Sequence, residues 1–142
     1  MQTHVLQETH DALTGLPNRR CVDDLVRALD LGARSDLVLV LIDLPCLADG
    51  MRKTIAQRLR ACARSDDMLA RLGDDRFALL LTPRLAQGEE EKLLGRLRTA
   101  IGAHVFGIAA EFGIARCPED GTSLEQLLAE ASQRLRSGTT AH

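Results

Sequence analysis

Apolar residues recur along the chain at two different spacings, and these spacings predict both helices and strands. One set recurs at three and four positions apart, which is typical of an amphipathic helix over about 18–30: Val22, Leu25, Val26 and Leu29. The run 37–42 is instead continuously apolar and rich in β-branched residues. Such a run is typical of a strand that is buried on both faces, so we expect 37–42 to be a central strand.

The same two patterns continue toward the C-terminus. Helical spacing predicts three further helices, over 51–64, 88–101 and 123–136. Apolar, β-rich runs predict three further strands, over 68–72, 77–82 and 106–115. The dipeptide Gly73-Asp74 between the second and third strands is a strong signal for a tight hairpin. The predicted order is therefore α-β-α-β-β-α-β-α.

This order predicts an α+β fold of the ferredoxin-like kind, a central and mostly antiparallel sheet flanked by helices. A right-handed β-α-β unit makes the first two strands parallel, and the hairpin then inserts the third strand between them. In that arrangement Asp43, at the end of the first strand, lies at the same edge as the hairpin tip 73–76. Eight apolar positions are predicted to lie in the core: Val38, Val40, Leu59, Leu79, Leu97, Ile108, Ile114 and Leu127.

Length and charge limit the classes of function. A chain of 142 residues with 45% apolar content fits one domain, which we place at 11–137, after a lead-in helix or linker (1–10) and before a disordered tail (138–142). The net charge is −2, no basic block is present, and Trp and Tyr are absent. A nucleic-acid polymer is therefore an unexpected partner, because duplexes attract basic surfaces and single strands stack on aromatic side chains.

Cysteines and hydropathy exclude two more classes. The four cysteines form no C-x-x-C pair, which argues against a zinc or redox site. The apolar run 37–42 is too short to span a bilayer, and the N-terminus lacks the pattern of a signal peptide. We therefore expect a cytoplasmic domain without membrane insertion.

Three motifs carry a family resemblance. They are Asp11-Ala-Leu-Thr-Gly-Leu-Pro-Asn-Arg-Arg20 (the first motif), Ala70-Arg-Leu-Gly-Asp-Asp-Arg-Phe77, and Gly113-Ile-Ala-Arg-Cys-Pro-Glu-Asp-Gly-Thr122. In this order and spacing the chain resembles the GGDEF, or diguanylate cyclase, family over roughly residues 9–136. The resemblance implies a nucleotidyl-cyclase palm-like fold. It also implies condensation of two GTP molecules into cyclic di-GMP at two metal ions that carboxylates hold.

The chain departs from the family at its signature. Gly-Gly-Asp-Glu-Phe is replaced by Gly73-Asp74-Asp75-Arg76-Phe77, which we call the signature hairpin. Asp74 puts a charged side chain where the family has glycine close to phosphate, and Arg76 puts a cation where the family has a carboxylate. Asp43 and Asp75 still match the two metal-binding acidic positions. The resemblance therefore implies at most a weak, vestigial magnesium site and no other cofactor.

A second departure follows the first strand. The family's D-x-D-x-F-K becomes Asp43-Leu-Pro-Cys-Leu-Ala48, and the stretch with the Asn and Asp that recognise guanine has no counterpart before Arg64. With the guanine loop and parts of the signature missing, we expect no catalytic residues and no cyclase activity.

One ligand-binding motif of the family is retained. Arg64-Ser-Asp-Asp67 lies five residues before the signature and resembles the family's inhibitory R-x-x-D site for cyclic di-GMP. A guanidinium donates two hydrogen bonds to guanine O6 and N7, and the carboxylate accepts from guanine N–H groups. A second arginine from the helix 88–101 often completes this site, which leaves Arg96 and Arg98 as candidates. The alternative is structural: Arg64 caps the end of its helix and Asp67 opens a turn.

Three hypotheses follow for function. The first is an inactive GGDEF domain that binds cyclic di-GMP as a receptor or regulatory module. The second is a nucleotide-free module for dimerisation or for contact with an adjacent sensor or EAL-type phosphodiesterase domain. The third is a GTP-binding regulator or a residual cyclase that uses Asp43 and Asp75.

Overall fold

The computed structural model describes residues 10–11, 14–31, 37–45, 49–64, 67–73, 75–81, 88–102 and 110–137. Within these residues the sheet has the order β2-β3-β1-β4-β5, and all neighbouring strands are antiparallel. The strands are β1 (Leu37–Asp43), β2 (Met68–Gly73), β3 (Arg76–Leu81), β4 (Glu111–Cys117) and β5 (Arg136–Ser137). The helices are α2 (Arg19–Leu31), the 3-10 turn η1 (Asp49–Met51), α3 (Arg52–Cys62), α4 (Glu89–Ile101) and α6 (Leu124–Gln133).

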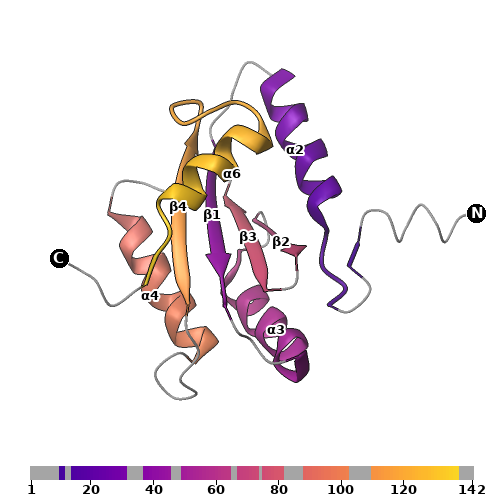
Figure 1. The fold of residues 1–142 in the computed structure, drawn as a ribbon, viewed down its shortest axis with the longest axis vertical. Coiled ribbons are helices and arrows are strands. Elements are labelled where there is room, and N and C mark those ends of the chain that lie inside the picture. The colour runs from indigo at the N-terminus through magenta and orange to yellow at the C-terminus, as the bar shows by residue number, and fades with distance from the viewer. Residues whose placement is uncertain are drawn as a thin grey trace, which may run out of the picture.

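The sheet is the middle of three layers (Figure 1). One apolar cluster joins it to α3 and α4, and a second joins its other face to α2 and α6. Alternate residues of β1 enter the two clusters, with Val38 and Val40 facing α3 and α4 and Leu37 and Leu39 facing α2 and α6. Because both faces are covered, every residue from 37 to 42 is fully buried, which explains the uninterrupted apolar run.

The predicted topology is confirmed. Strand β1 is central, and β3 lies between β2 and β1 as the split β-α-β arrangement requires. The β2–β3 hairpin is tight, with Gly73 paired to Arg76. Six of the predicted core positions are fully buried: Val38, Val40, Leu59, Leu79, Leu97 and Leu127. Ile114 is half-buried and packs against the α3–α4 cluster, and Ile108 lies outside the described residues.

The C-terminal boundaries differ from the prediction. The last helix begins as predicted, with Ser123 and Gln126 forming a capping box, but it ends at Gln133 instead of 136. The Arg134 guanidinium donates to the Ile114 carbonyl and to Asp120, and the chain then pairs Arg136 with Phe112 as β5. Helical spacing does not reveal this end, because a strand edge and a distant carboxylate determine it.

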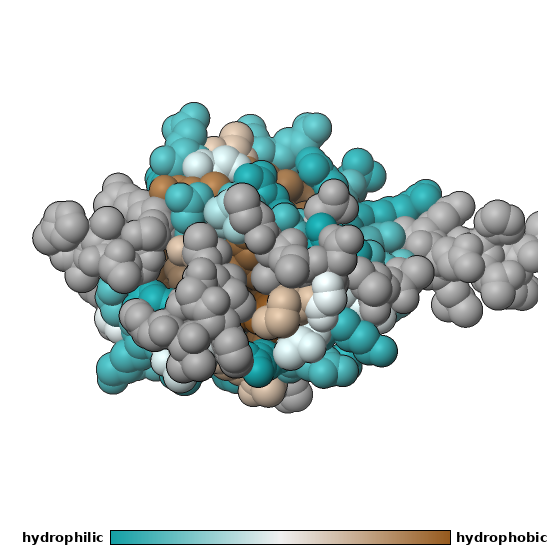
Figure 2. Space-filling model, turned by 60° about the horizontal axis from the view of Figure 1, so that its bottom comes forward, coloured by the Kyte–Doolittle hydropathy of each residue, from teal (hydrophilic) through white to brown (hydrophobic). Residues whose placement is uncertain are grey.

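Other predicted segments are described only in part. The last long strand was expected over 106–115; β4 extends to Cys117, and residues 103–109 lie outside the described residues. The same applies to 1–9 of the predicted lead-in segment and to the predicted tail 138–142. In the part of the chain that is described, no helix is long and apolar enough to cross a membrane. On the face shown in Figure 2, hydrophilic residues surround smaller hydrophobic areas.

Candidate functional site

The structure brings Asp43 and the signature hairpin together, as the topology predicts. Asp43 is the register partner of Arg76 across β1 and β3. The Arg76 Nε atom lies 3.5 Å from Asp43 Oδ1, and the Leu44 backbone N–H donates to the Asp75 carbonyl at 2.8 Å. The cation that replaces a family carboxylate therefore faces one of the two expected metal ligands.

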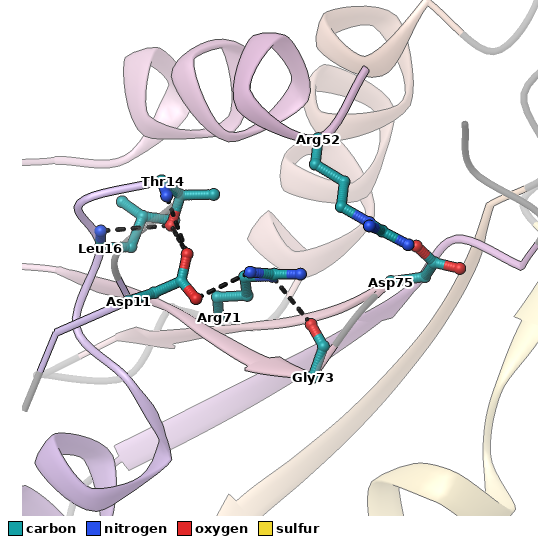
Figure 3. Close-up of polar contacts among 7 residues, drawn as sticks. All are labelled: Asp11, Thr14, Leu16, Arg52, Arg71, Gly73 and Asp75. Atoms are coloured by element: carbon teal, nitrogen blue, oxygen red, sulfur yellow. Dashed lines mark hydrogen bonds and ion pairs between the residues drawn. The ribbon is translucent and has the colours of Figure 1, made fainter. Parts of the chain in front are cut away.

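The other expected metal ligand also faces an arginine. Arg52, the first residue of α3, points to Asp75 in the hairpin tip (Figure 3). Its Nε atom lies 3.2 Å from Asp75 Oδ1, and both side chains are mostly buried, with exposed fractions of 17% and 24%. Partial burial strengthens such a pair, because water screens it less.

These residues do not fit a divalent metal ion. Magnesium prefers anionic oxygen ligands, whereas here each carboxylate has a guanidinium against it. No group of three His, Cys, Asp or Glu side chains comes together among the residues described. Asp74 lies outside them.

A second polar network ties the first motif to β2 (Figure 3). Asp11 accepts hydrogen bonds from the Thr14 backbone at 2.8 Å and its hydroxyl at 2.7 Å, and from the Arg71 guanidinium at 2.7 Å. Arg71 Nε donates to the Gly73 carbonyl at 3.0 Å. Partial burial raises the pKa of Asp11, but the hydrogen bonds from Thr14 and Arg71 outweigh it, so the pKa falls below its usual value.

The sequence alone assigns no role to this network. The Asp-x-x-Thr spacing is a usable signal for the local turn between Asp11 and Thr14. The partner Arg71 is 60 positions away, and only the pairing of the first motif with β2, through the Asn18–Arg71 bridge, puts it in reach.

The retained R-x-x-D motif forms a closed pair. Arg64 Nε and a terminal nitrogen donate to the two Asp67 carboxylate oxygens at 3.2 and 3.1 Å, and the Arg64 backbone N–H donates to the same carboxylate at 2.9 Å. The exposed fraction of the Arg64 side chain is 53%, and that of Asp67 is 2%. The Arg64 guanidinium is therefore exposed to solvent, whereas the Asp67 carboxylate that binds it is buried.

One part of the structural alternative, the turn at Asp67, is visible as well. The Asp67 backbone N–H donates to the Arg64 carbonyl at 3.0 Å, so these residues close the turn between α3 and β2. Helix α3 ends at Cys62, and the Ala63 backbone N–H donates to the Arg60 carbonyl at its end.

A cavity of about 340 Å³ lies beside this pair, and we call it the arginine cavity. Its lining residues are Leu16, Pro17, Arg60, Ala63, Arg64, Asp67, Met68 and Leu69. The cavity is at the start of β2, whereas the signature hairpin is at its other end. The R-x-x-D motif and the signature hairpin therefore lie at opposite ends of β2.

The two candidate second arginines lie in different places. Cys62, at the end of α3, lies against Arg96, because its Sγ atom is 3.8 Å from the Arg96 carbonyl oxygen. The nearby Arg96 charge lowers the pKa of the Cys62 thiol, but burial raises this pKa by more. Arg98 lies instead over the Phe112 ring of β4, at 5.9 Å from the centroid. Its Nε atom is buried with no hydrogen-bond partner among the described residues. Arg96 is therefore the candidate on the side of Arg64.

Comparison with known sequences agrees with the fold and the motifs. The family model described as "Diguanylate cyclase, GGDEF domain" matches residues 8–141. The chain belongs to the GGDEF family. Among curated relatives, the GGDEF domain is 36% identical over 141 positions to the bifunctional diguanylate cyclase/cyclic di-GMP phosphodiesterase MucR of Pseudomonas aeruginosa. It is 32% identical over 151 positions to the diguanylate cyclase TpbB of the same species.

These relatives are much longer proteins. The matches cover 86% and 91% of this GGDEF domain but only 21% of MucR and 34% of TpbB.

Solved structures show the same fold. The GGDEF domain of P. aeruginosa TpbB superposes with a TM-score of 0.70 at 27% identity, over 88% of this chain and 85% of that chain. The GGDEF domain of P. aeruginosa FimX superposes with a TM-score of 0.74 at 23% identity, over 89% and 90%.

Proposed function

We propose that this GGDEF domain is a non-catalytic regulatory module that binds cyclic di-GMP at Arg64. The observation that carries the proposal is the Arg64 guanidinium, which Asp67 holds in place and which is half exposed at the arginine cavity. A guanidinium held in one orientation is suited to guanine, because the O6 and N7 acceptors of that base accept two parallel hydrogen bonds.

In this proposal Asp67 is a positioning residue. With 2% of its side chain exposed, its carboxylate is too buried to accept hydrogen bonds from guanine, the role that the family resemblance implied. It acts by fixing the guanidinium through two side-chain hydrogen bonds. Fixing the donor before binding lowers the entropic cost of ordering it in the complex.

Arg96 is the proposed second arginine. Arg96 lies beside the end of α3, which supports this role. Arg98 is less suited, because its guanidinium lies over the Phe112 ring of β4.

The loss of catalysis is supported at the other end of β2. Arg76 and Arg52 engage Asp43 and Asp75, the residues that match the family's metal ligands. The connection from β1 to α3 is only residues 44–51, and it carries no counterpart of the family's guanine-recognising stretch. We further propose that the domain acts within a longer protein, beside a sensor or phosphodiesterase domain or as a dimer.

Calorimetric titration with cyclic di-GMP tests the proposal. Arg64→Ala should weaken binding by about 1–3 kcal/mol, the scale of one bidentate guanine contact, and Arg64→Lys should restore little of it. Arg27→Ala is the matched control, because Arg27 is an exposed arginine on α2 whose carboxylate partner is also local. Absence of binding heat and of ligand-induced amide NMR shifts near residue 64 would sink the receptor proposal in favour of a nucleotide-free interaction module.

A further inference from the structure

We propose that Arg60 is a further ligand-binding residue, in addition to Arg64 and Arg96, and that it donates to a phosphate of the same nucleotide whose guanine Arg64 contacts. This inference rests on the proposed function and deepens it. It assigns a specific role to a residue outside the R-x-x-D motif.

The position of Arg60 is the first support. Arg60 lies in the last turn of α3, four residues before Arg64, and both line the arginine cavity. Helix α3 also carries Arg52, Lys53 and Arg58, but none of these three is a lining residue of this cavity. Arg60 is therefore the one cation within α3 that the described cavity includes.

Charge is the second support. Among the described residues, the cavity lining contains two guanidiniums and one carboxylate, and both oxygens of that carboxylate accept hydrogen bonds from Arg64. The positive charge of Arg60 is exposed at the same rim. A phosphodiester supplies the missing negative charge, and guanidinium–phosphate hydrogen bonds are among the stronger ones because both groups are ionised.

The shape and the rest of the lining are the third support. Apart from the arginines and Asp67, the described lining residues are apolar: Leu16, Pro17, Ala63, Met68 and Leu69. An apolar wall suits the flat face of a base, while the arginines suit its polar edge and the phosphate. A volume of about 340 Å³ is at the lower end for ligand sites, so the cavity holds one nucleotide half of the dinucleotide and leaves the other outside.

Calorimetry on matched variants tests the assignment. Arg60→Gln should lower the affinity for cyclic di-GMP about tenfold, the scale of a hydrogen bond to a charged group. Lys53→Gln is the control, because it removes one exposed positive charge from the same helix outside the cavity and should change affinity less than about twofold. Thermal denaturation of each variant checks that the fold is retained.

The conservative variants separate the two arginines. Arg60→Lys should keep most of the affinity, because an ammonium also donates to phosphate, whereas Arg64→Lys should lose it, because an ammonium lacks the planar fork. Raising the salt concentration should weaken binding less steeply in Arg60→Gln than in the wild type, because one ionic contact is already absent. The adenine analogue cyclic di-AMP, with the same phosphates, should not bind the wild type.

Two failures are distinguishable. If the wild type does not bind cyclic di-GMP, the proposed function fails and this inference fails with it. If the wild type binds and Arg64→Ala does not, but Arg60→Gln binds like Lys53→Gln, only the role of Arg60 is overturned. If Arg60→Gln does not fold, Arg60→Lys provides the test. An affinity of Arg60→Lys as low as that of Arg64→Lys would then overturn the proposed role of Arg60.

Discussion

Asp43 and Arg76 stand opposite each other on β1 and β3, with 3.5 Å between the Arg76 Nε and Asp43 Oδ1 atoms. In the family sequence the position of Arg76 is acidic, so the active signature places two anions on this edge that need metal ions to neutralise them. Here an arginine supplies the counter-charge within the chain. The Arg76–Asp43 contact leaves less negative charge at this edge for metal ions to neutralise, which supports the proposed loss of catalysis.

We expect no synthesis of cyclic di-GMP from GTP with magnesium or manganese. Restoring the signature with Asp74→Gly and Arg76→Glu should not rescue it, because the guanine-recognising stretch between β1 and α3 is still absent. Chromatography of the nucleotide products measures the outcome, with an active cyclase as positive control. Sustained product above a no-protein control in the wild type would contradict this prediction.

Magnesium should leave the thermal denaturation midpoint unchanged. A ligand that binds only the folded state raises this midpoint, and the arginines facing Asp43 and Asp75 disfavour such binding. Melting curves in millimolar magnesium and in EDTA, at equal ionic strength, make the comparison. A midpoint that rises with magnesium in the wild type but not in Asp75→Asn would show that a metal site is retained.

Asp11→Asn should destabilise the fold by about 1–3 kcal/mol, because it weakens the hydrogen bonds from Thr14 and removes the ion pair with partly buried Arg71. Asp23→Asn is the control, since it removes an exposed i,i+4 pair with Arg27 and should cost at most about 0.5 kcal/mol. Urea denaturation measures both variants. Equal losses would mean that the Asp11 network adds nothing beyond a surface ion pair.

Two glycine substitutions should have opposite effects. A Cβ atom at Gly113 on β4 would lie 2.0 Å from the Ala131 backbone oxygen of α6, so Gly113→Ala should cost about 3 kcal/mol or more. Gly95 lies within α4 with open space around its Cβ position, so Gly95→Ala should stabilise the helix by about 0.5–1 kcal/mol. Denaturation midpoints measure the stability of both variants. A Gly113→Ala variant as stable as the wild type would contradict the close packing of α6 on β4.

Acid should weaken the C-terminal turn through Asp120. Hydrogen bonds from Arg134, together with one from the Arg116 backbone, lower the pKa of Asp120 from 3.8 to about 2. Because the folded-state pKa is lowered, the pair contributes its full stability above pH 4 and loses it as pH falls toward 2. The contribution is about 1 kcal/mol, because solvent screens the pair. Urea denaturation at several pH values should show this loss in the wild type and not in Asp120→Asn; a slope that is the same in both would refute it.

The sequence by itself determined the order of the elements, the central position of β1 and the family motifs. Periodicity is local, so 37–42 indicates a strand covered on both faces without reference to what covers it. The hairpin and the handedness of the crossover then brought Asp43 to the signature. Helix ends and strand ends were less determined, as the early end of α6 at Gln133 shows.

Only the tertiary structure decided which charges meet. Arg52 and Asp75 are 23 positions apart, and Arg71 and Asp11 are 60, so their pairing depends on how helices and strands are placed. The burial of Asp67, the choice of Arg96 over Arg98 and the inclusion of Arg60 in the arginine cavity are likewise invisible in the sequence. The physical reason is that a sequence pattern fixes the face on which a side chain lies, whereas its partners and its access to solvent depend on the packing of distant segments.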